Sequence, residues 1–112
     1  MSDAESKDPE RAIEYIFNHG KRYAKAKAER RYLEEYRKSL KAILMKRTIE
    51  LAVNAQEREA YSDPEYIELL QGLRAAVEIE EEVHWGLVAA QARIEVWRSM
   101  EATNRAEGKA TI

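Results

Sequence analysis

The feature that most constrains the fold is the placement of proline, which occurs at two positions, Pro9 and Pro64. Each proline follows an aspartate. An aspartate can cap a helix with its side chain, and a proline ring fits the first helical position. No further proline interrupts the stretch after either Asp-Pro pair. The spacing therefore predicts two long helices, of about 50 and about 43 residues, separated by a turn at 61–64.

Composition agrees with long helices. Charged residues make up 36% of the 112 residues and hydrophobic residues 45%, with four glycines, which suits helices with charged surfaces in a single domain. The sequence has no cysteine, and this excludes a disulfide framework and a thiol nucleophile. We find no apolar run long enough for a membrane span and no signal peptide. We therefore expect no membrane partner and a location in the cytoplasm, which the resemblance below would make that of a bacterial host.

Apolar residues recur at helical spacing in both stretches and predict one core stripe on each helix. A short turn makes two such helices antiparallel neighbours. The predicted fold class is therefore all-α, a coiled-coil-like antiparallel two-helix hairpin over 9–107, with a disordered N-terminus at 1–8 and a frayed C-terminus at 108–112. A break near Gly20 stays open, although a continuous helix is favoured. The predicted stripes are Leu33, Tyr36, Leu40, Ile43, Leu44 and Leu51, and Leu69, Leu73, Ala76, Val83, Leu87, Ala90, Ile94 and Trp97.

The second helix is apolar on more than one side, and a single neighbouring helix can cover only one of them. A large apolar patch left in water usually marks an interface. The pattern therefore predicts a closed homo-oligomer; the alternative is a patch that binds another protein. Two glycines two heptads apart would let backbones approach closely. The predicted oligomer interface comprises Gly72, Trp85, Gly86, Val88, Ala92, Val96 and Trp97.

Charge is strongly segregated along the chain. The stretch 21–47 holds 11 Lys and Arg against three Glu, a net of +8, whereas the whole chain carries −2. Basic residues interleaved with aromatic ones suit a single strand held without sequence readout, while most charge runs are simply solvated helix faces. Residues 87–104 are predicted to lie opposite and to leave this end positive. The candidate nucleic-acid-binding residues are Lys21, Arg22, Tyr23, Lys25, Lys27, Arg30, Arg31, Tyr32, Arg37 and Lys38.

Charged residues also fall on the predicted core stripes. A turn centred near 62–63 places Arg47 opposite the acidic cluster of the second helix, and we expect an Arg47–Glu80 ion pair, because pairing offsets most of the cost of burying two charges. Glu81 and His84 have the Glu-x-x-His spacing of di-iron bundles, so a dimeric metal site is a lesser alternative. We find no activated nucleophile and no phosphate-binding loop. We therefore expect neither catalysis nor a cofactor.

Two segments carry a resemblance to known proteins. Residues 23–39 (YAKAKAERRYLEEYRKS) and 87–99 (LVAAQARIEVWRS) resemble a family of small helical proteins encoded by tailed bacteriophages and prophages. The layout is also similar to phage recombination mediators of the UvsY type, although no recombinase-contacting motif can be placed on this chain. The resemblance implies an oligomer that binds single-stranded DNA and assists a recombinase or single-strand-binding protein.

The leading hypothesis is thus a phage accessory protein that binds single-stranded DNA without sequence preference in recombination or replication. The first alternative is an adaptor or inhibitor that docks a host protein through Trp85, Val88 and Trp97. The second alternative is the dimeric metal-binding bundle.

Overall fold

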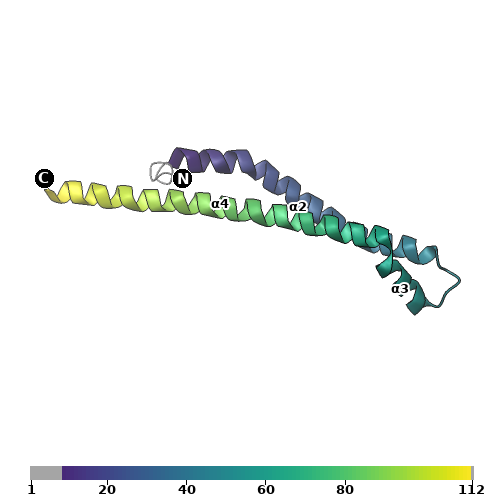
Figure 1. Cartoon of the computed structure of the whole chain (residues 1–112). Coiled ribbons are helices and arrows are strands. Elements are labelled where there is room, and N and C mark those ends of the chain that lie inside the picture. The colour runs from purple at the N-terminus through teal and green to yellow at the C-terminus, as the bar shows by residue number, and fades with distance from the viewer. Residues whose placement is uncertain (1–8, 112) are drawn as a thin grey trace. The chain divides into compact units, whose positions relative to one another are not determined.

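The computed structural model describes residues 9–111, and these are helical except for 47–52 and residue 63. They form α2 (Pro9–Lys46), α3 (Val53–Ser62) and α4 (Pro64–Thr111), with no strand in this part of the chain (Figure 1). The all-α class is confirmed. Helix α2 begins at Pro9, as predicted, and runs through Gly20 without a break. Asp8, its predicted cap, and the predicted disordered segment 1–8 lie outside the described residues. Helix α4 continues through Gly108, beyond the predicted end near Glu107.

The expected first helix of about 50 residues is wrong, because α2 ends at Lys46. After it, Thr48 donates its N–H to the carbonyl of Met45 at 3.2 Å, a bond three residues back that tightens the chain out of the α-helix. The Thr48 hydroxyl donates to the same carbonyl. Gln56 then donates its side-chain amide to the carbonyl of Leu51 at 2.8 Å. These bonds serve backbone groups that a continuous helix would have paired internally.

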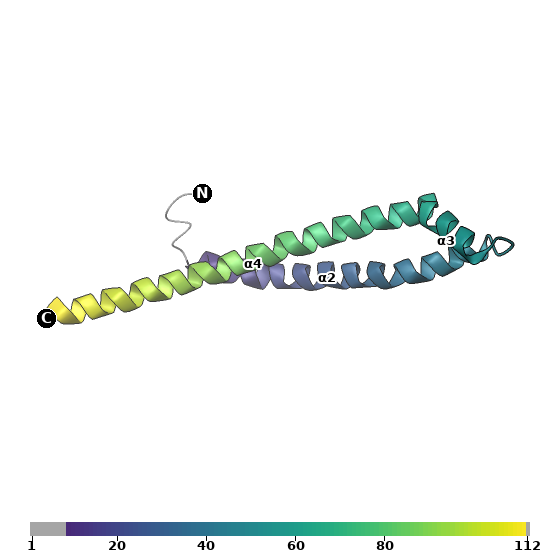
Figure 2. The same ribbon diagram turned by 90° about the horizontal axis from the view of Figure 1, so that it is seen from below.

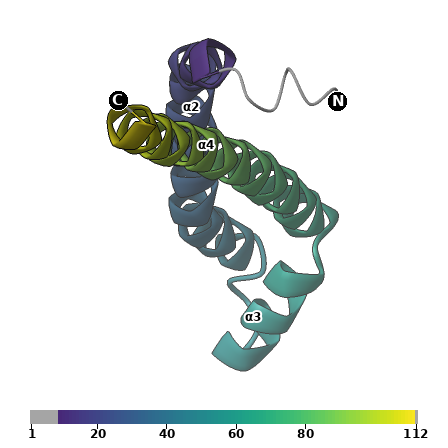
Figure 3. The ribbon, with the colours of Figure 1, turned by 90° about the vertical axis from the view of Figure 1, so that its left-hand side faces the viewer.

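Asp63 alone separates α3 from α4, so the predicted turn at 61–64 is reduced to a one-residue joint (Figures 2 and 3). The chain reverses direction at 47–52 instead, as Figure 2 shows. Asp63 has extended backbone angles, φ −66° and ψ 135°. Its carboxylate accepts the N–H of Glu65 at 2.8 Å, as a helix cap does. Pro64 then occupies the first position of α4, where its missing N–H has no cost. The Asp-Pro signal thus marks a true helix start, but a short helix precedes it.

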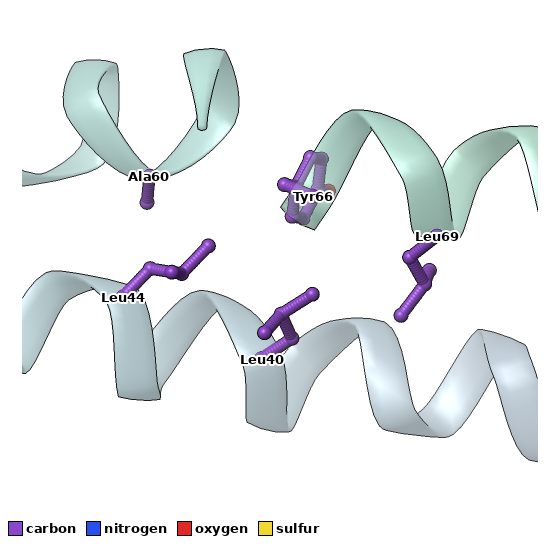
Figure 4. Close-up of a cluster of buried hydrophobic side chains, with 5 residues drawn as sticks. All are labelled: Leu40, Leu44, Ala60, Tyr66 and Leu69. Carbon is purple, nitrogen blue, oxygen red and sulfur yellow. The ribbon is translucent and has the colours of Figure 1, made fainter. Parts of the chain in front are cut away.

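The described residues form two compact units, Ala24–Glu81 and the described parts of Met1–Tyr23 and Glu82–Ile112. In the Ala24–Glu81 unit, buried side chains of all three helices meet in one core (Figure 4). Leu40 and Leu44 of α2 face Tyr66 and Leu69 of α4, and Ala60 of α3 closes the end of the cluster. The positions that meet show that α2 and α4 run antiparallel within this unit.

In the other unit the most buried side chains are small: Ala12 of α2, and Val83 and Ala90 of α4. The ring and hydroxyl of Tyr15 occupy the place where a side chain at Gly86 would begin. Tyr15 also stacks on His19, with ring centroids 3.9 Å apart. Gly86 therefore admits an aromatic ring of its own chain, which corrects its predicted role in a close approach between subunits. Gly72, in contrast, borders open space, and a methyl group there would meet no side chain of the described residues within 4 Å.

Candidate nucleic-acid interface

Arg30, which the sequence predicts to be unpaired, is neutralised within the Ala24–Glu81 unit. Arg30 donates to Glu80 through Nε and through Nη2, the second bond at 3.1 Å. Its Nη1 donates to both carboxylate oxygens of Glu34 at 3.1 Å, one helical turn along α2. Arg30 is thus committed to a structural ion pair and is unsuited to bind a phosphate.

The predicted Arg47–Glu80 pair is wrong, because Arg30 is the partner of Glu80. Arg47 lies beside Glu65, with Nη1 to Oε1 at 3.0 Å, and this contact raises the pKa of Arg47. The prediction assumed that the first helix continues without a break to the turn at 61–64. In the structure the segment 47–52 and α3 occupy those positions, and this shifts which residues of α2 and α4 lie opposite one another. Position 30 therefore faces 80. The acidic part of α4, rather than residues 87–104, lies against the middle of the basic segment.

Glu80 is buried, at 8% exposure, and is ionised because of its neighbours. Hydrogen bonds from Arg30 lower the pKa of Glu80 against the opposing effect of burial, and the charges of Arg30, Lys27 and Arg31 lower it further. Arg30 in turn has its pKa raised, first by the hydrogen bond to Glu80 and then by that to Glu34. The buried carboxylate of Glu80 thus offsets part of the positive charge of Arg30, Lys27 and Arg31, and Arg30 donates hydrogen bonds to it directly.

Lys41 belongs to the end of the unit near α3. Its ammonium lies 3.4 Å from Glu57 and 4.8 Å from the ring centroid of Tyr61. The hydrogen bond to Tyr61 is the main cause that raises the pKa of Lys41, and Glu57 adds to it. This lysine joins α2 to α3 and is not part of a ligand surface.

Four of the predicted basic residues flank Tyr32 in the Ala24–Glu81 unit, with Lys27, Arg31 and Lys38 on one side of its ring and Lys25 on the other. We call Lys25, Lys27, Arg31 and Lys38 the basic surface. Lys25 and Arg31 are exposed and show no ion pair within residues 9–111. Lys38 makes one exposed contact with Glu35 at 3.5 Å, and such pairs contribute little. Lys27 is half-buried.

The other predicted residues take different places. Arg37 is half-buried and, seven residues after Arg30, lies on the same side of α2, away from the basic surface. Lys21, Arg22 and Tyr23 belong to the other unit, in which Tyr23 lies 5.9 Å from the His84 ring. Tyr23 is half-buried and is a poor stacking platform.

Two hollows, of about 630 Å3 and about 500 Å3, lie on either side of Tyr32. The first, of 630 Å3, lies over Ala24 and Ala28, with Lys27 and Arg31 on its wall. The second, of 500 Å3, is lined by apolar side chains such as Leu40 and Leu69, with Gly72 and the carboxylates of Glu65 and Glu68. Of these two hollows, the first has the charge that a phosphate requires.

Sequence reasoning missed Tyr36 as a partner of Tyr32. The two rings are parallel within 6° and their centroids are 5.9 Å apart. Tyr32 is 62% exposed and Tyr36 is 39% exposed, although the apolar pattern places Tyr36 in the core stripe. The spacing of four residues, which brings side chains together on a helix, is a signal that could have revealed the pair.

The predicted interface and metal residues all lie on α4. Trp85 is 62% exposed, Val96 59% and Trp97 40%. His84 packs against the Trp85 ring at 5.3 Å. Within residues 9–111 no three His, Cys, Asp or Glu side chains are grouped as a metal site requires. No helix in that range is long and apolar enough to span a membrane.

Comparison of the chain with protein-family models, curated proteins and solved structures gave no match.

Proposed function

We propose that this protein binds single-stranded DNA without sequence preference through the basic surface. The observation that carries the proposal is the juxtaposition at the 630 Å3 hollow, where Lys27 and Arg31 share a wall with Tyr32. Cations that track a phosphate backbone, beside an aromatic ring that can stack on bases, are the usual elements of such binding. A role as a recombination or replication mediator rests on the phage resemblance alone.

The test neutralises three exposed cations of the basic surface in one variant, Lys25→Gln, Arg31→Gln and Lys38→Gln. Glutamine is a good helix former, and Arg30 is left intact because it holds Glu80. Fluorescence anisotropy with a labelled single strand should show much weaker binding at low salt. The slope of log affinity against log salt should become shallower by about 2, since each lost phosphate contact on a single strand removes about 0.7.

The matched control removes the same charge elsewhere, in the variant Arg58→Gln, Arg74→Gln and Arg105→Gln. These three side chains are also exposed. If both triple variants lose affinity equally, binding follows net charge and the site is not the basic surface. If the parent protein binds no strand at low salt, the proposed function is wrong.

A second function is favoured by the exposed apolar side chains of α4. We propose that Trp85, Val88, Val96 and Trp97 pack against a second copy of the chain, because large exposed aromatic and aliphatic groups on one helix usually mark an interface. Several copies would multiply the phosphate contacts along a strand. Sedimentation velocity should show a mass that increases with concentration. A Trp85→Lys and Trp97→Lys variant should stay monomeric, and a parent that is monomeric at high concentration would favour the adaptor alternative.

A further inference from the structure

We infer that the Ala24–Ala28 hollow is a pocket for one unpaired nucleobase, which stacks on Tyr32 while its backbone phosphate contacts Arg31. This inference rests on the proposed function and adds how the surface distinguishes single strands from duplexes. In a duplex the base faces are already stacked on neighbouring base pairs, whereas a single strand presents them.

The floor of the hollow is formed by alanines, and this is what makes room for a base. Ala24 and Ala28 are one turn apart on α2, between Lys27 and Arg31 on one side and Tyr32 on the other. A longer side chain at either alanine would fill the space against the ring. The four-residue spacing of Ala24 and Ala28 thus gives a low floor beside Lys27 and Arg31.

The wall of the hollow has an aromatic ring that is both exposed and held in place. Tyr32 is 62% exposed and stacks on Tyr36, which lies behind it one turn further along α2. Because Tyr36 restrains the ring, Tyr32 loses less freedom when a base stacks on it. Glu35 also lines the hollow and opposes a phosphate there, but Lys27 and Arg31 on the same wall outnumber it.

Lys25 extends the cationic boundary to the other side of the ring. It precedes Tyr32 by seven residues and so lies on the same side of α2. A strand whose base enters the hollow therefore meets positive charge on both sides of Tyr32. The second hollow is lined by the carboxylates of Glu65 and Glu68 and by no lysine or arginine.

The test compares an ordinary oligothymidylate with an abasic strand of equal length, so that the phosphates are the same and the bases are absent. We expect the parent protein to bind the ordinary strand about tenfold more tightly, the effect of stacking one base on an aromatic ring. Tyr32→Leu should remove this difference, whereas Tyr32→Phe, which keeps the ring, should retain it.

A second variant tests the pocket without touching the ring or a charge. Ala28→Leu fills the hollow and should also remove the preference for the ordinary strand. Ala42→Leu, at an exposed alanine of α2 outside the hollow, should leave it intact. Circular dichroism should show unchanged helicity in all four variants.

The outcomes separate this inference from the proposed function. A parent protein that binds both strands equally, or a Tyr32→Leu or Ala28→Leu variant that keeps the preference, would overturn the base pocket and leave phosphate binding standing. A parent protein that binds neither strand would overturn both.

Discussion

At the scale of single residues, two glycines of α4 have opposite roles. Gly86 receives the ring of Tyr15, whereas Gly72 borders open space in the second hollow. The heptad spacing of the two glycines predicts a close approach between subunits at both. Sequence spacing alone could not tell them apart, because the difference depends on which side chain of α2 reaches each position.

Alanine at these two positions should therefore change stability in opposite directions. Gly72→Ala should raise the free energy of unfolding by up to about 1 kcal/mol, the gain in helix propensity. Gly86→Ala gains the same propensity but must displace Tyr15 from its stack on His19, and we expect a net loss of about 1 kcal/mol. Urea denaturation followed by circular dichroism measures both. Equal stabilisation by the two substitutions would contradict the contact between Tyr15 and Gly86.

Glu80 gives a prediction about pH. Its pKa in the folded state is lowered from the ordinary 4.5, chiefly by Arg30. A carboxylate with a lowered folded-state pKa stabilises the fold above its unfolded pKa, and this contribution is lost as pH falls through the folded value. Glu80→Gln should therefore lower the urea midpoint at pH 7. The difference from the parent protein should shrink progressively as the pH falls below about 4.5.

The matched control for this pH dependence is Glu35→Gln, which removes a carboxylate from an exposed pair. It should have almost no effect on the midpoint at any pH. If the gap between the parent protein and Glu80→Gln were the same at pH 7 and pH 3, the contact with Arg30 would not be what stabilises ionised Glu80.

At the scale of elements, the end of α2 and the short α3 determine which residues meet. The chain leaves the helix after Lys46 and returns as α3, and Ala60 thereby reaches the core beside Leu44. The helical class, the start of α2 at Pro9 and the Asp63 cap were all predictable, because each depends on a local signal. The break at 47–52 was not, since Thr48 and Gln56 stabilise it by hydrogen bonds that leave no periodic pattern.

The missed break also explains the errors in the candidate site. Once α3 takes up ten residues, every cross-helix pairing shifts, and Arg30 replaces Arg47 as the partner of Glu80. The basic surface was predictable as a group because its charges are local in sequence. That only Lys25, Lys27, Arg31 and Lys38 of the predicted residues remain in it could not be predicted, because this depends on which residues of α2 and α4 lie opposite one another.

Neighbouring residues of α2 test this account of the core. Leu44 is 3% exposed and Ile43 is 44% exposed. Leu44→Ala should lower the free energy of unfolding by about 2 to 4 kcal/mol, because it removes buried methyl groups and leaves a cavity. Ile43→Ala should cost less than about 1 kcal/mol, as surface substitutions do. Thermal or urea unfolding of the two variants measures the two losses of stability. Similar losses would contradict the observation that α2 buries Leu44 and exposes Ile43.

At the scale of the whole molecule, charge is concentrated rather than abundant. The chain carries a net −2, yet one unit presents a cluster of cations that its own carboxylates neutralise only in part. Arg30 contributes to stability through Glu80 and Glu34, and the exposed cations beside Tyr32 are the ones that we propose contact a ligand. The structural role and the proposed ligand-binding role thus fall on neighbouring residues of one helix.

The central claim is that these exposed cations hold the phosphates of a single strand. The most direct measurement is the affinity of the parent protein for a labelled oligothymidylate by fluorescence anisotropy, over a series of salt concentrations. With three or four phosphate contacts, log affinity should fall with log salt at a slope of about −2 to −3. An absence of binding at low salt, or an affinity that does not change with salt, would contradict the account.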